Sequence, residues 1–287
     1  MDLNVFREKM LIWAKLNHQN IARLYNYSTN PLFHEIEYCG KNLKEVYNSI
    51  KSEERIFKII FDVSEGLKHA HTRNILHRNL TSANVMFDGR DAKISNWYCA
   101  RYVNRVSRDL QKPYSKYLAP EMILKKKEGF YTDIWQLGVL FYELTTGRVP
   151  FNNKDEILNI KVVHPYEIIN KCLSKRRKRR YQSVEDFQND LKALINEKYE
   201  NFVENKEMFK GISYCCDLLL ICLKNNDGVN AYKYLDDLIE YVDNNSIKED
   251  LKHLKESIKY RLENHIPIPK EIIYNAEIIT HKIKLVK

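Results

Sequence analysis

Two short stretches hold the side chains whose types and spacing point to chemistry. They are HRNLTSANV, residues 77–85, and KISNWYCAR, residues 93–101. The amide of Asn79 cannot take up a proton at ordinary pH, so it cannot serve as a general base. Asn84 and Asn96 place two further neutral amides in the same two stretches.

Helices and strands must position these stretches. Apolar residues at 56, 59, 60, 63, 67 and 70 recur at three- and four-residue steps, which predicts a long amphipathic helix in EERIFKIIFDVSEGLKHAHTRN. VMF and AKIS lie on either side of Asp88-Gly89 and predict two short strands joined by a turn. YTDIWQLGVLFYELTTG is apolar almost all round, which predicts a helix buried in a large core.

The flanking segments are also predicted to be mainly helical. Residues 5–18 have helical apolar spacing, and residues 20–40 predict two short strands around Asn30-Pro31. DEILNI, PYEIINKCL and SVEDFQNDLKALI predict further helices, and four more are predicted at 204–224, 229–243, 246–264 and 270–285. We interpret these last four as a small bundle. The alternative is a repeat-like platform for a protein partner, although no repeat period is visible.

The composition is typical of a soluble globular protein, with 44% hydrophobic and 30% charged residues among 287. No apolar run is long enough to cross a bilayer, so no membrane association is expected.

The net charge of +9 is uneven: residues 1–198 carry 34 basic and 23 acidic side chains, and residues 199–287 carry 13 basic and 15 acidic side chains. Six cysteines without a C-x-x-C pair favour reduced thiols over disulfides or zinc, and hence a cytoplasmic protein with no dedicated metal site.

Six segments occur in an order that resembles the eukaryotic-type protein kinase family, in its serine/threonine form. They are LNHQNIARLY, EIEYCGKNL, GLKHAHTRNILHRNLTSANVMF, KISNWYCAR, YLAPE and DIWQLGVLFYELTTGRVPF. The resemblance covers residues 1–198 and implies a mainly α (α+β) fold. A remnant of the N-lobe is expected at 1–39, with the family's C helix and its fourth and fifth strands. A C-lobe at 40–198 and a helical C-terminal extension at 199–287 follow.

Five retained residues are architectural in this family. Glu121, in Ala-Pro-Glu, corresponds to a glutamate that pairs with an arginine, and Arg180 is the best candidate for that arginine. Asp133 corresponds to the aspartate that holds the backbone of the catalytic loop. His77 corresponds to a histidine that packs against the metal-binding motif, and Arg78 to an arginine that often pairs with a phosphorylated activation segment. The resemblance therefore implies structural roles for all five.

The residues that perform the reaction in the family are mostly replaced. The aspartate of H-R-D-L-x-x-x-N, which accepts the proton of the substrate hydroxyl, is Asn79, and the metal-binding aspartate of D-F-G is Asn96. The catalytic-loop lysine is Thr81, and the threonine that bonds that lysine aligns with Tyr114. Asn84, the second metal ligand of the family, survives as a candidate residual magnesium ligand.

Half of the family's ATP-binding site has no counterpart in the sequence. The chain begins at the stretch that resembles the C helix, without an upstream G-x-G-x-x-G loop or phosphate-pairing lysine. Lys9 falls nearest the place of the C-helix glutamate, with Glu8 one residue away. No cofactor is therefore expected, and the alternative is weak binding of ATP and magnesium.

Three functions follow from these observations. The first is a pseudokinase that binds protein partners, such as an active kinase, as a regulator or scaffold and does not transfer phosphate. The first alternative is an ATP-binding protein kinase of weak or altered activity, whose N-lobe is missing through a misread start or comes from a partner chain. The second alternative is nucleic-acid binding through the basic run KRRKRR, residues 175–180, although no stacking aromatic pattern accompanies it.

Hydroxyl side chains in the predicted activation segment are candidate phosphorylation sites. They belong to Ser107, Tyr114, Ser115 and Tyr117. We expect Arg78 to receive a phosphate placed there, because a phosphate monoester pairs well with a guanidinium.

Overall fold

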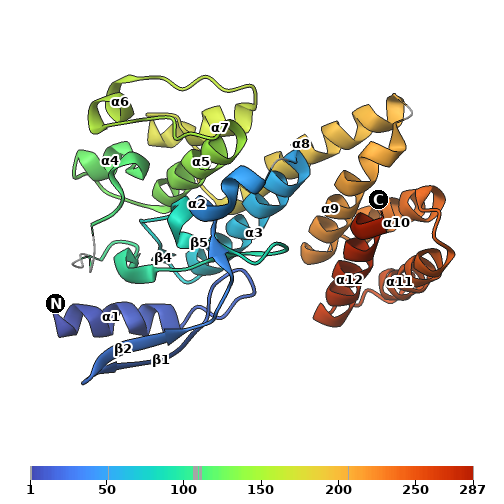
Figure 1. Cartoon of the computed structure of the whole chain (residues 1–287), viewed down its shortest axis with the longest axis horizontal. Helices are drawn as coiled ribbons and strands as arrows, with labels where there is room; N and C mark the ends of the chain where they lie inside the picture. The colour runs from blue at the N-terminus through green and yellow to red at the C-terminus, as the bar shows by residue number, and fades with distance from the viewer. Residues whose placement is uncertain (1, 51, 106–108, 110–111, 206, 287) are drawn as a thin grey trace. The chain divides into compact units, whose positions relative to one another are not determined.

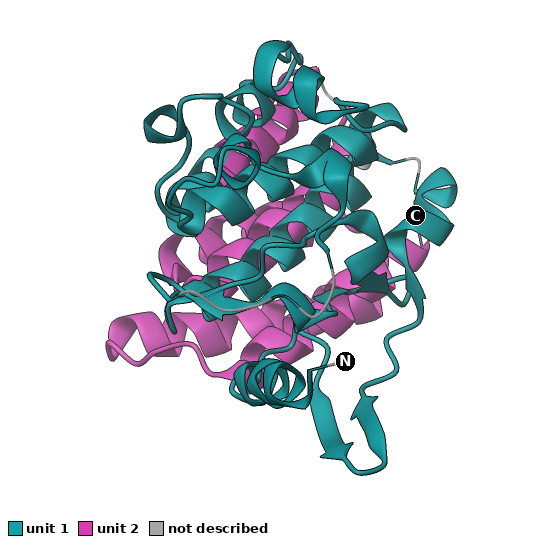
Figure 2. Ribbon diagram, turned by 90° about the vertical axis from the view of Figure 1, so that its left-hand side faces the viewer, with its two compact units in different colours: residues 1–190 teal, residues 191–287 magenta. Residues whose placement is uncertain are grey.

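The computed structural model describes residues 2–50, 52–105, 109, 112–205 and 207–286. The chain divides into two compact units, residues 1–190 and 191–287, which Figure 2 colours separately. Both this division and the predicted domain boundary near residue 198 fall within helix α8 (Val184–Glu204). The fold is mainly helical with a few short strands, as predicted (Figure 1).

A helix and a hairpin open unit 1. Helix α1 (Leu3–Ala14) is capped by Asp2, whose carboxylate accepts the backbone N–H groups of Asn4 and Val5. Strands β1 (Leu24–Thr29) and β2 (Leu32–Ile36) form an antiparallel pair. The predicted helix and both predicted strands are present.

Two long helices form the centre of unit 1. Helix α3 (Glu53–His71) is capped by Ser52, and helix α5 (Phe130–Thr146) ends at Gly147, whose φ of 75° favours glycine. The two helices contact each other. The apolar positions that predicted α3 are all buried: Ile56, Ile59, Ile60, Val63, Leu67 and Ala70. Helix α5 is buried over most of its length, which explains why its sequence lacks a polar face.

Short strands position the two stretches that carry the asparagines. Strands β5 (Val85–Phe87) and β6 (Ala92–Ile94) pair antiparallel, and β3 (Lys41–Asn42) adds a third strand beside β5. Strand β4 (Ile75–Leu76) pairs with β7 (Arg101–Tyr102). Residues 77–84 therefore connect β4 to β5, and Asn96 lies two residues after the end of β6. Both stretches are fixed at each end by strand pairing.

Short helices complete unit 1. They are α2 (Leu43–Val46), α4 (Pro120–Ile123), α6 (Lys154–Asn159) and α7 (Glu167–Cys172), followed by the start of α8. The segments that predicted helices at DEILNI and PYEIINKCL correspond to α6 and α7. Within the described residues, no helix combines the length and the apolar character needed to span a membrane.

The described residues of unit 2 form four helices in addition to the end of α8. They are α9 (Met208–Lys224), α10 (Gly228–Tyr241), α11 (Asn245–Glu263) and α12 (Lys270–Val286), close to the predicted ranges. Each packs on the next, and α12 also contacts α9, so the four helices close on themselves. This closed arrangement has the form of a bundle, and it differs from an open row of repeats.

Candidate functional site

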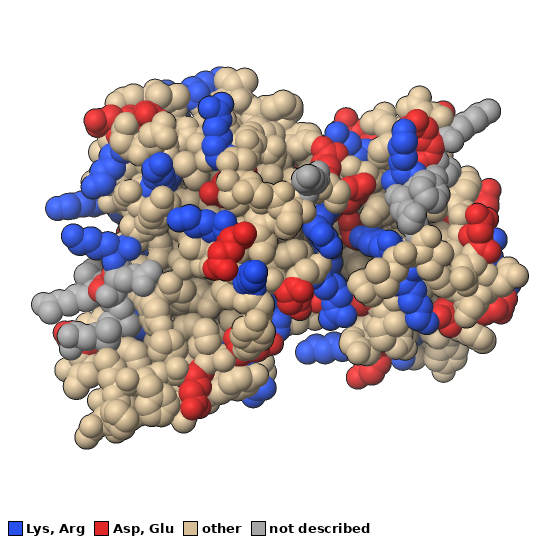
Figure 3. Space-filling view, in the orientation of Figure 1, with Lys and Arg blue, Asp and Glu red and all other residues tan. Residues whose placement is uncertain are grey.

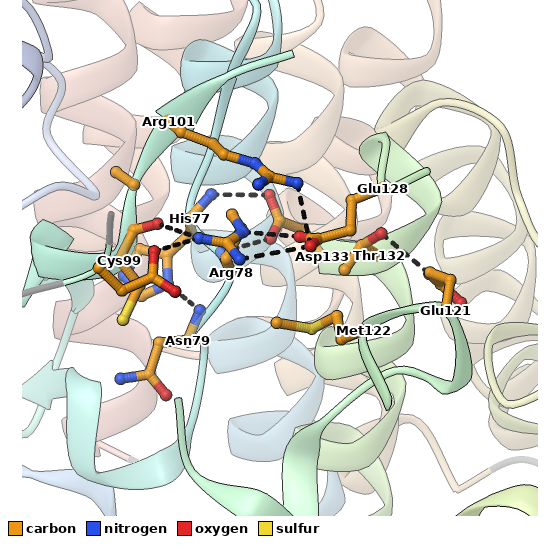
Figure 4. Close-up of polar contacts among 12 residues, drawn as sticks. His77, Arg78, Asn79, Cys99, Arg101, Glu121, Met122, Glu128, Thr132 and Asp133 are labelled. Atoms are coloured by element: carbon orange, nitrogen blue, oxygen red, sulfur yellow. Dashed lines mark hydrogen bonds and ion pairs between the residues drawn. The ribbon is translucent and has the colours of Figure 1, made fainter. Parts of the chain in front are cut away.

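A buried carboxylate organises the loop between β4 and β5. Asp133, on α5, accepts the backbone N–H of His77 at 2.9 Å and that of Arg78 at 2.8 Å (Figure 4). Its carboxylate also lies 2.9 Å from Nε2 of His71. Burial by itself raises the pKa of Asp133, but the hydrogen bond and charge of His71 outweigh it and leave the pKa below its usual value. A charged acceptor therefore fixes the start of this loop.

His77 joins the two candidate stretches. Its ring packs edge-on against the ring of Trp97 at 4.6 Å, and its Nε2 lies 3.0 Å from the carbonyl of Ser95. Its Nδ1 accepts the backbone N–H of Asn79 at 3.2 Å. Complete burial lowers the pKa of His77 despite the nearby Asp133 carboxylate, so the ring is neutral at physiological pH. A neutral ring with both nitrogens occupied acts as a structural link.

Arg78 is surrounded by acceptors. Its Nε donates to Glu128 at 2.6 Å, its Nη1 donates to the carbonyl of Cys99 at 3.0 Å, and the guanidinium also pairs with Asp109. Arg101 reaches the other oxygen of Glu128 at 2.9 Å. Burial lowers the pKa of Arg78, but Glu128 and Asp109 outweigh it and raise the pKa above its usual value. The group that was expected to receive a phosphate already holds two carboxylates.

Asn79 serves as an anchor for another segment. Its side-chain carbonyl accepts the backbone N–H of Tyr114 at 2.9 Å, and its own backbone carbonyl accepts Nδ2 of Asn84 at 2.7 Å. Figure 4 shows the Asn79 side chain outside the network of Arg78 and Asp133. The amide oxygen is thus engaged by the main chain of the predicted activation segment.

Asn84 and Asn96, the two candidate metal ligands, bind each other. Nδ2 of Asn96 donates to Oδ1 of Asn84 at 2.8 Å. Asn96 has a left-handed backbone, with φ of 61°, and its own Oδ1 is buried without a hydrogen-bond partner among the described residues. One amide oxygen is therefore occupied and the other remains as a lone neutral acceptor.

This donor set does not fit a magnesium ion. Magnesium in phosphoryl-transfer sites is held by carboxylates together with nucleotide oxygens in near-octahedral geometry. Among the described residues, the two candidate ligand positions offer only the oxygens of two amides, which hydrogen-bond to each other. In the part of the chain that the structure describes, no group of three or more His, Cys, Asp or Glu side chains is arranged to hold a metal.

A basic cavity opens beside Asn79. It has a volume of about 640 Å³, and its lining includes Asn79, Thr81 and Asn84. Four cations contribute to the lining: Lys44, Lys112, Lys116 and Arg148. In Figure 3, Lys and Arg side chains gather over the part of unit 1 where Figure 1 labels α2 and α4. Tyr114 lines the same cavity as Thr81.

A second ion pair lies away from this cavity. Glu121 and Arg180 form a bidentate pair, with distances of 2.9 and 3.0 Å, and the Thr132 hydroxyl donates to the same carboxylate at 2.9 Å. Both side chains are almost fully buried. The Arg180 guanidinium also lies 4.8 Å from the ring centroid of Trp135. The pair therefore joins the start of α4 to the segment before α8.

The basic run 175–180 does not form one uniform surface. Arg180 is buried in its ion pair, and Lys175 packs over the rings of Trp135 and Phe151 at 5.0 and 4.1 Å while it donates to the carbonyl of Ile157. Burial and the nearby Arg180 lower the pKa of Lys175 to about 8. Arg177 bonds the carbonyl of Lys127. The exposed members that have no side-chain partner within the described residues are Arg176, Lys178 and Arg179.

The four candidate phosphorylation sites differ in access. Ser107 lies outside the described residues. Tyr114 and Ser115 are exposed, whereas Tyr117 is 1% exposed and its hydroxyl donates to Glu143. In the folded chain the Tyr117 hydroxyl is thus closed to a modifying enzyme.

Several contacts around the candidate site have no signal in the sequence. Glu128 and Asp109 belong to no motif, and Glu128 lies 50 residues from Arg78. Lys9 is fully buried on α1, and its Nζ donates to the carbonyl of Ala100 at 2.9 Å. Burial lowers the pKa of Lys9, although Glu8 opposes this shift. A buried lysine thereby joins α1 to the segment that follows Asn96.

Comparison with known proteins agrees with this architecture. The family model described as "Protein kinase domain" matches residues 2–225. The human serine/threonine-protein kinase Nek5 is 33% identical over 168 residues, which cover 53% of this chain and 23% of that protein. Mouse Aurora kinase C is 32% identical over 153 residues, which cover 51% of this chain and 55% of that protein.

A relative from Encephalitozoon cuniculi, a probable serine/threonine-protein kinase, is 26% identical over 211 residues, covering 72% of this chain and 39% of that protein. The chain spans less than two thirds of the length of each of these relatives. The predicted fold class, a mainly helical kinase-like domain followed by further helices, is confirmed. Because the family model matches well over half of its residues, the chain belongs to the protein kinase domain family.

Proposed function

We propose that this chain is a pseudokinase, which binds protein partners as a regulator or scaffold and does not transfer phosphate. The observation that carries the proposal is the hydrogen bond between Asn96 and Asn84. In an active kinase the two corresponding residues hold the magnesium ions that bridge the phosphates. Here the two side chains bind each other, and neither brings a negative charge.

The electrostatic consequence is large. A transferred phosphoryl group carries charge that metal ions must neutralise, and catalysis consists mainly of positioning and electrostatic stabilisation. Loss of a general base by itself lowers a rate by about 10²–10⁴. At position 79 the amide oxygen accepts the N–H of Tyr114, so it is also not free to orient a substrate hydroxyl. Both defects act on the same transition state.

The competing function is phosphotransfer, because the three relatives are named as kinases, two of them as serine/threonine-protein kinases. In that case Asn84 and the free oxygen of Asn96 would bind magnesium with ATP, and Asn79 would position the acceptor. Weak or altered activity of this kind requires nucleotide binding first. Nucleotide affinity therefore separates the two functions.

Calorimetric titration of the purified 287-residue protein with ATP, with and without Mg²⁺, tests the proposal. We expect no binding at millimolar nucleotide, and no transfer of labelled phosphate from ATP to a generic acceptor such as casein. Binding tighter than ~100 μM that depends on Mg²⁺ would contradict the proposal. The Asn96→Asp variant is the matched control, because it restores a charged oxygen at one candidate ligand without changing the size of the side chain.

A further inference from the structure

The basic cavity beside Asn79 has cations that the rest of the protein does not neutralise. Within the described residues, no ion pair or side-chain hydrogen bond is found for Lys44, Lys112, Lys116 or Arg148. The acidic side chain in the lining is Glu143, and one of its oxygens accepts the Tyr117 hydroxyl. Four cations against one carboxylate leave a net positive hollow. Such a concave site concentrates the field of its charges and attracts anions.

The floor of the cavity carries donors as well. Asn79 is 2% exposed, and its amide oxygen is already used by the backbone N–H of Tyr114. No described residue accepts a hydrogen bond from its Nδ2 group. The hydroxyls of Thr81 and Ser82 line the same cavity. An aspartate at position 79 would repel a bound anion. Asparagine instead offers the anion an N–H donor. With asparagine, this part of the cavity therefore favours an anion over a cation.

The size and the surroundings of the cavity favour a short peptide over a nucleic-acid strand. A volume of about 640 Å³ is in the range of sites for small ligands. Binding of single strands without sequence preference relies on aromatic faces on which successive bases stack. The two tyrosines of the lining already pack against other rings, Tyr114 with Tyr117 and Tyr142 with His164. Val149 and Pro150 add apolar surface that suits peptide side chains.

We infer that this cavity binds a phosphorylated side chain of a protein partner, with Lys116, Arg148 and Lys44 around the phosphate and Asn79 beneath it. A phosphate monoester brings a charge of about −1.5 to −2 and three strong acceptor oxygens, which matches a set of cations above a donor floor. The inference rests on the proposed function. A kinase that transfers phosphate has a basic aspartate at the position of Asn79, and that negative charge would repel a bound phosphate. The site would bind the product of another kinase rather than make it.

Phosphopeptide binding to the full chain tests the inference. The probe is a fluorescent peptide library with phosphoserine fixed at its centre and degenerate flanking residues, compared with the same library containing serine. We expect the protein to retain the phosphoserine library and to bind little of the serine library. Millimolar inorganic phosphate should displace the retained phosphopeptides. Equal retention of both libraries, or no retention of either, would overturn the inference.

Variants locate the site. Lys116→Ala and Arg148→Ala are each expected to weaken phosphopeptide binding about tenfold, because each removes a charge-assisted hydrogen bond. Asn79→Asp should weaken it by a similar factor through repulsion. Lys178→Ala is the matched control, since Lys178 is an exposed cation outside the cavity, and less than a twofold change is expected. Equal losses in Lys178→Ala and Lys116→Ala would show general charge attraction and overturn the inference.

Two further measurements separate the outcomes. A single-stranded oligonucleotide is compared with inorganic phosphate as a competitor of the phosphopeptide. If the oligonucleotide displaces the peptide at the lower concentration, the surface binds nucleic acid and the inference is overturned. Thermal unfolding of each variant, followed by tryptophan fluorescence, shows whether a loss of binding is a loss of folding. ATP titration of the same preparation distinguishes the two proposals: a chain that binds neither ATP nor phosphopeptide keeps the proposed function and loses only this inference.

Discussion

Arg78 and Glu128 form a buried ion pair, in which Nε of the guanidinium lies 2.6 Å from a carboxylate oxygen and both side chains are less than 10% exposed. Asp109 and the carbonyl of Cys99 occupy other faces of the same guanidinium. Carboxylates therefore take the place that a phosphate on the activation segment was expected to fill. This arrangement holds the segment after β6 without any modification.

The Glu128→Gln substitution tests how much this pair stabilises unit 1. It removes the negative charge that faces both Arg78 and Arg101. The free energy of unfolding should therefore fall by about 3 kcal/mol, the lower end of the cost of removing one partner from a buried ion pair. Urea unfolding followed by tryptophan fluorescence measures it, because all three tryptophans lie in unit 1. Glu35→Gln, at an exposed position, is the control, with an expected change under about 0.5 kcal/mol. A change for Glu128→Gln no larger than that of the control would show that Asp109 alone satisfies Arg78.

The pair of Glu121 and Arg180 should behave as a unit. Glu121→Ala and Arg180→Met are each expected to destabilise unit 1 by about 3–5 kcal/mol, because each leaves the partner charge buried. The double variant should lose much less than the sum of the two, and a double-mutant cycle measures the difference. Lys171→Ala breaks an exposed pair with Asp190 and should change stability by less than about 1 kcal/mol. Additive losses in the cycle would refute a direct coupling.

Acid should weaken unit 1 partly through Asp91. Burial raises the pKa of Asp91, but Lys58 and Arg90 outweigh it and lower the pKa to about 2, below its ordinary value of 3.8. Because the folded-state pKa is the lower one, the stabilising contribution is fully present above about pH 4 and is lost as the pH falls through about 2. The wild-type protein should therefore unfold at higher urea concentration than Asp91→Asn at pH 6, and the gap should narrow as the pH falls from 4 to 2. A gap that stays constant over this interval would contradict the assigned shift.

The thiols should be protected in the folded chain. All six cysteines are free and buried, and burial raises the pKa of Cys39 and of Cys222 to about 11. Because the thiolate is the reactive form, Ellman's reagent should label the native protein very slowly at pH 8. In denaturant it should label six thiols for each chain. Rapid labelling of one native thiol would indicate that its surroundings open locally, and peptide mapping would identify which one.

Much of the architecture could be predicted from the sequence. The apolar spacing in α3 predicted a buried stripe, and the absence of a polar face in α5 predicted a fully buried helix, because period and polarity are local properties of the chain. The four helices of unit 2 lie near their predicted ranges because Asp227-Gly228 and Asn244-Asn245 provide turn and capping residues in the sequence itself. Helix α9 begins four residues later than predicted because α8 continues to Glu204.

The sequence by itself determined which residue types occupy the motif positions, and so which charges are absent from the site. That Asn79, Thr81 and Asn96 carry no charge follows from the sequence alone. Only the tertiary structure revealed what these positions contact: Asn96 bonds Asn84, and Asn79 holds the main chain at Tyr114. The physical reason is distance along the chain. Contacts such as Arg78 with Glu128, or Lys9 with Ala100, join residues 50 and 91 positions apart, and no local period encodes which distant groups a fold brings within hydrogen-bond reach.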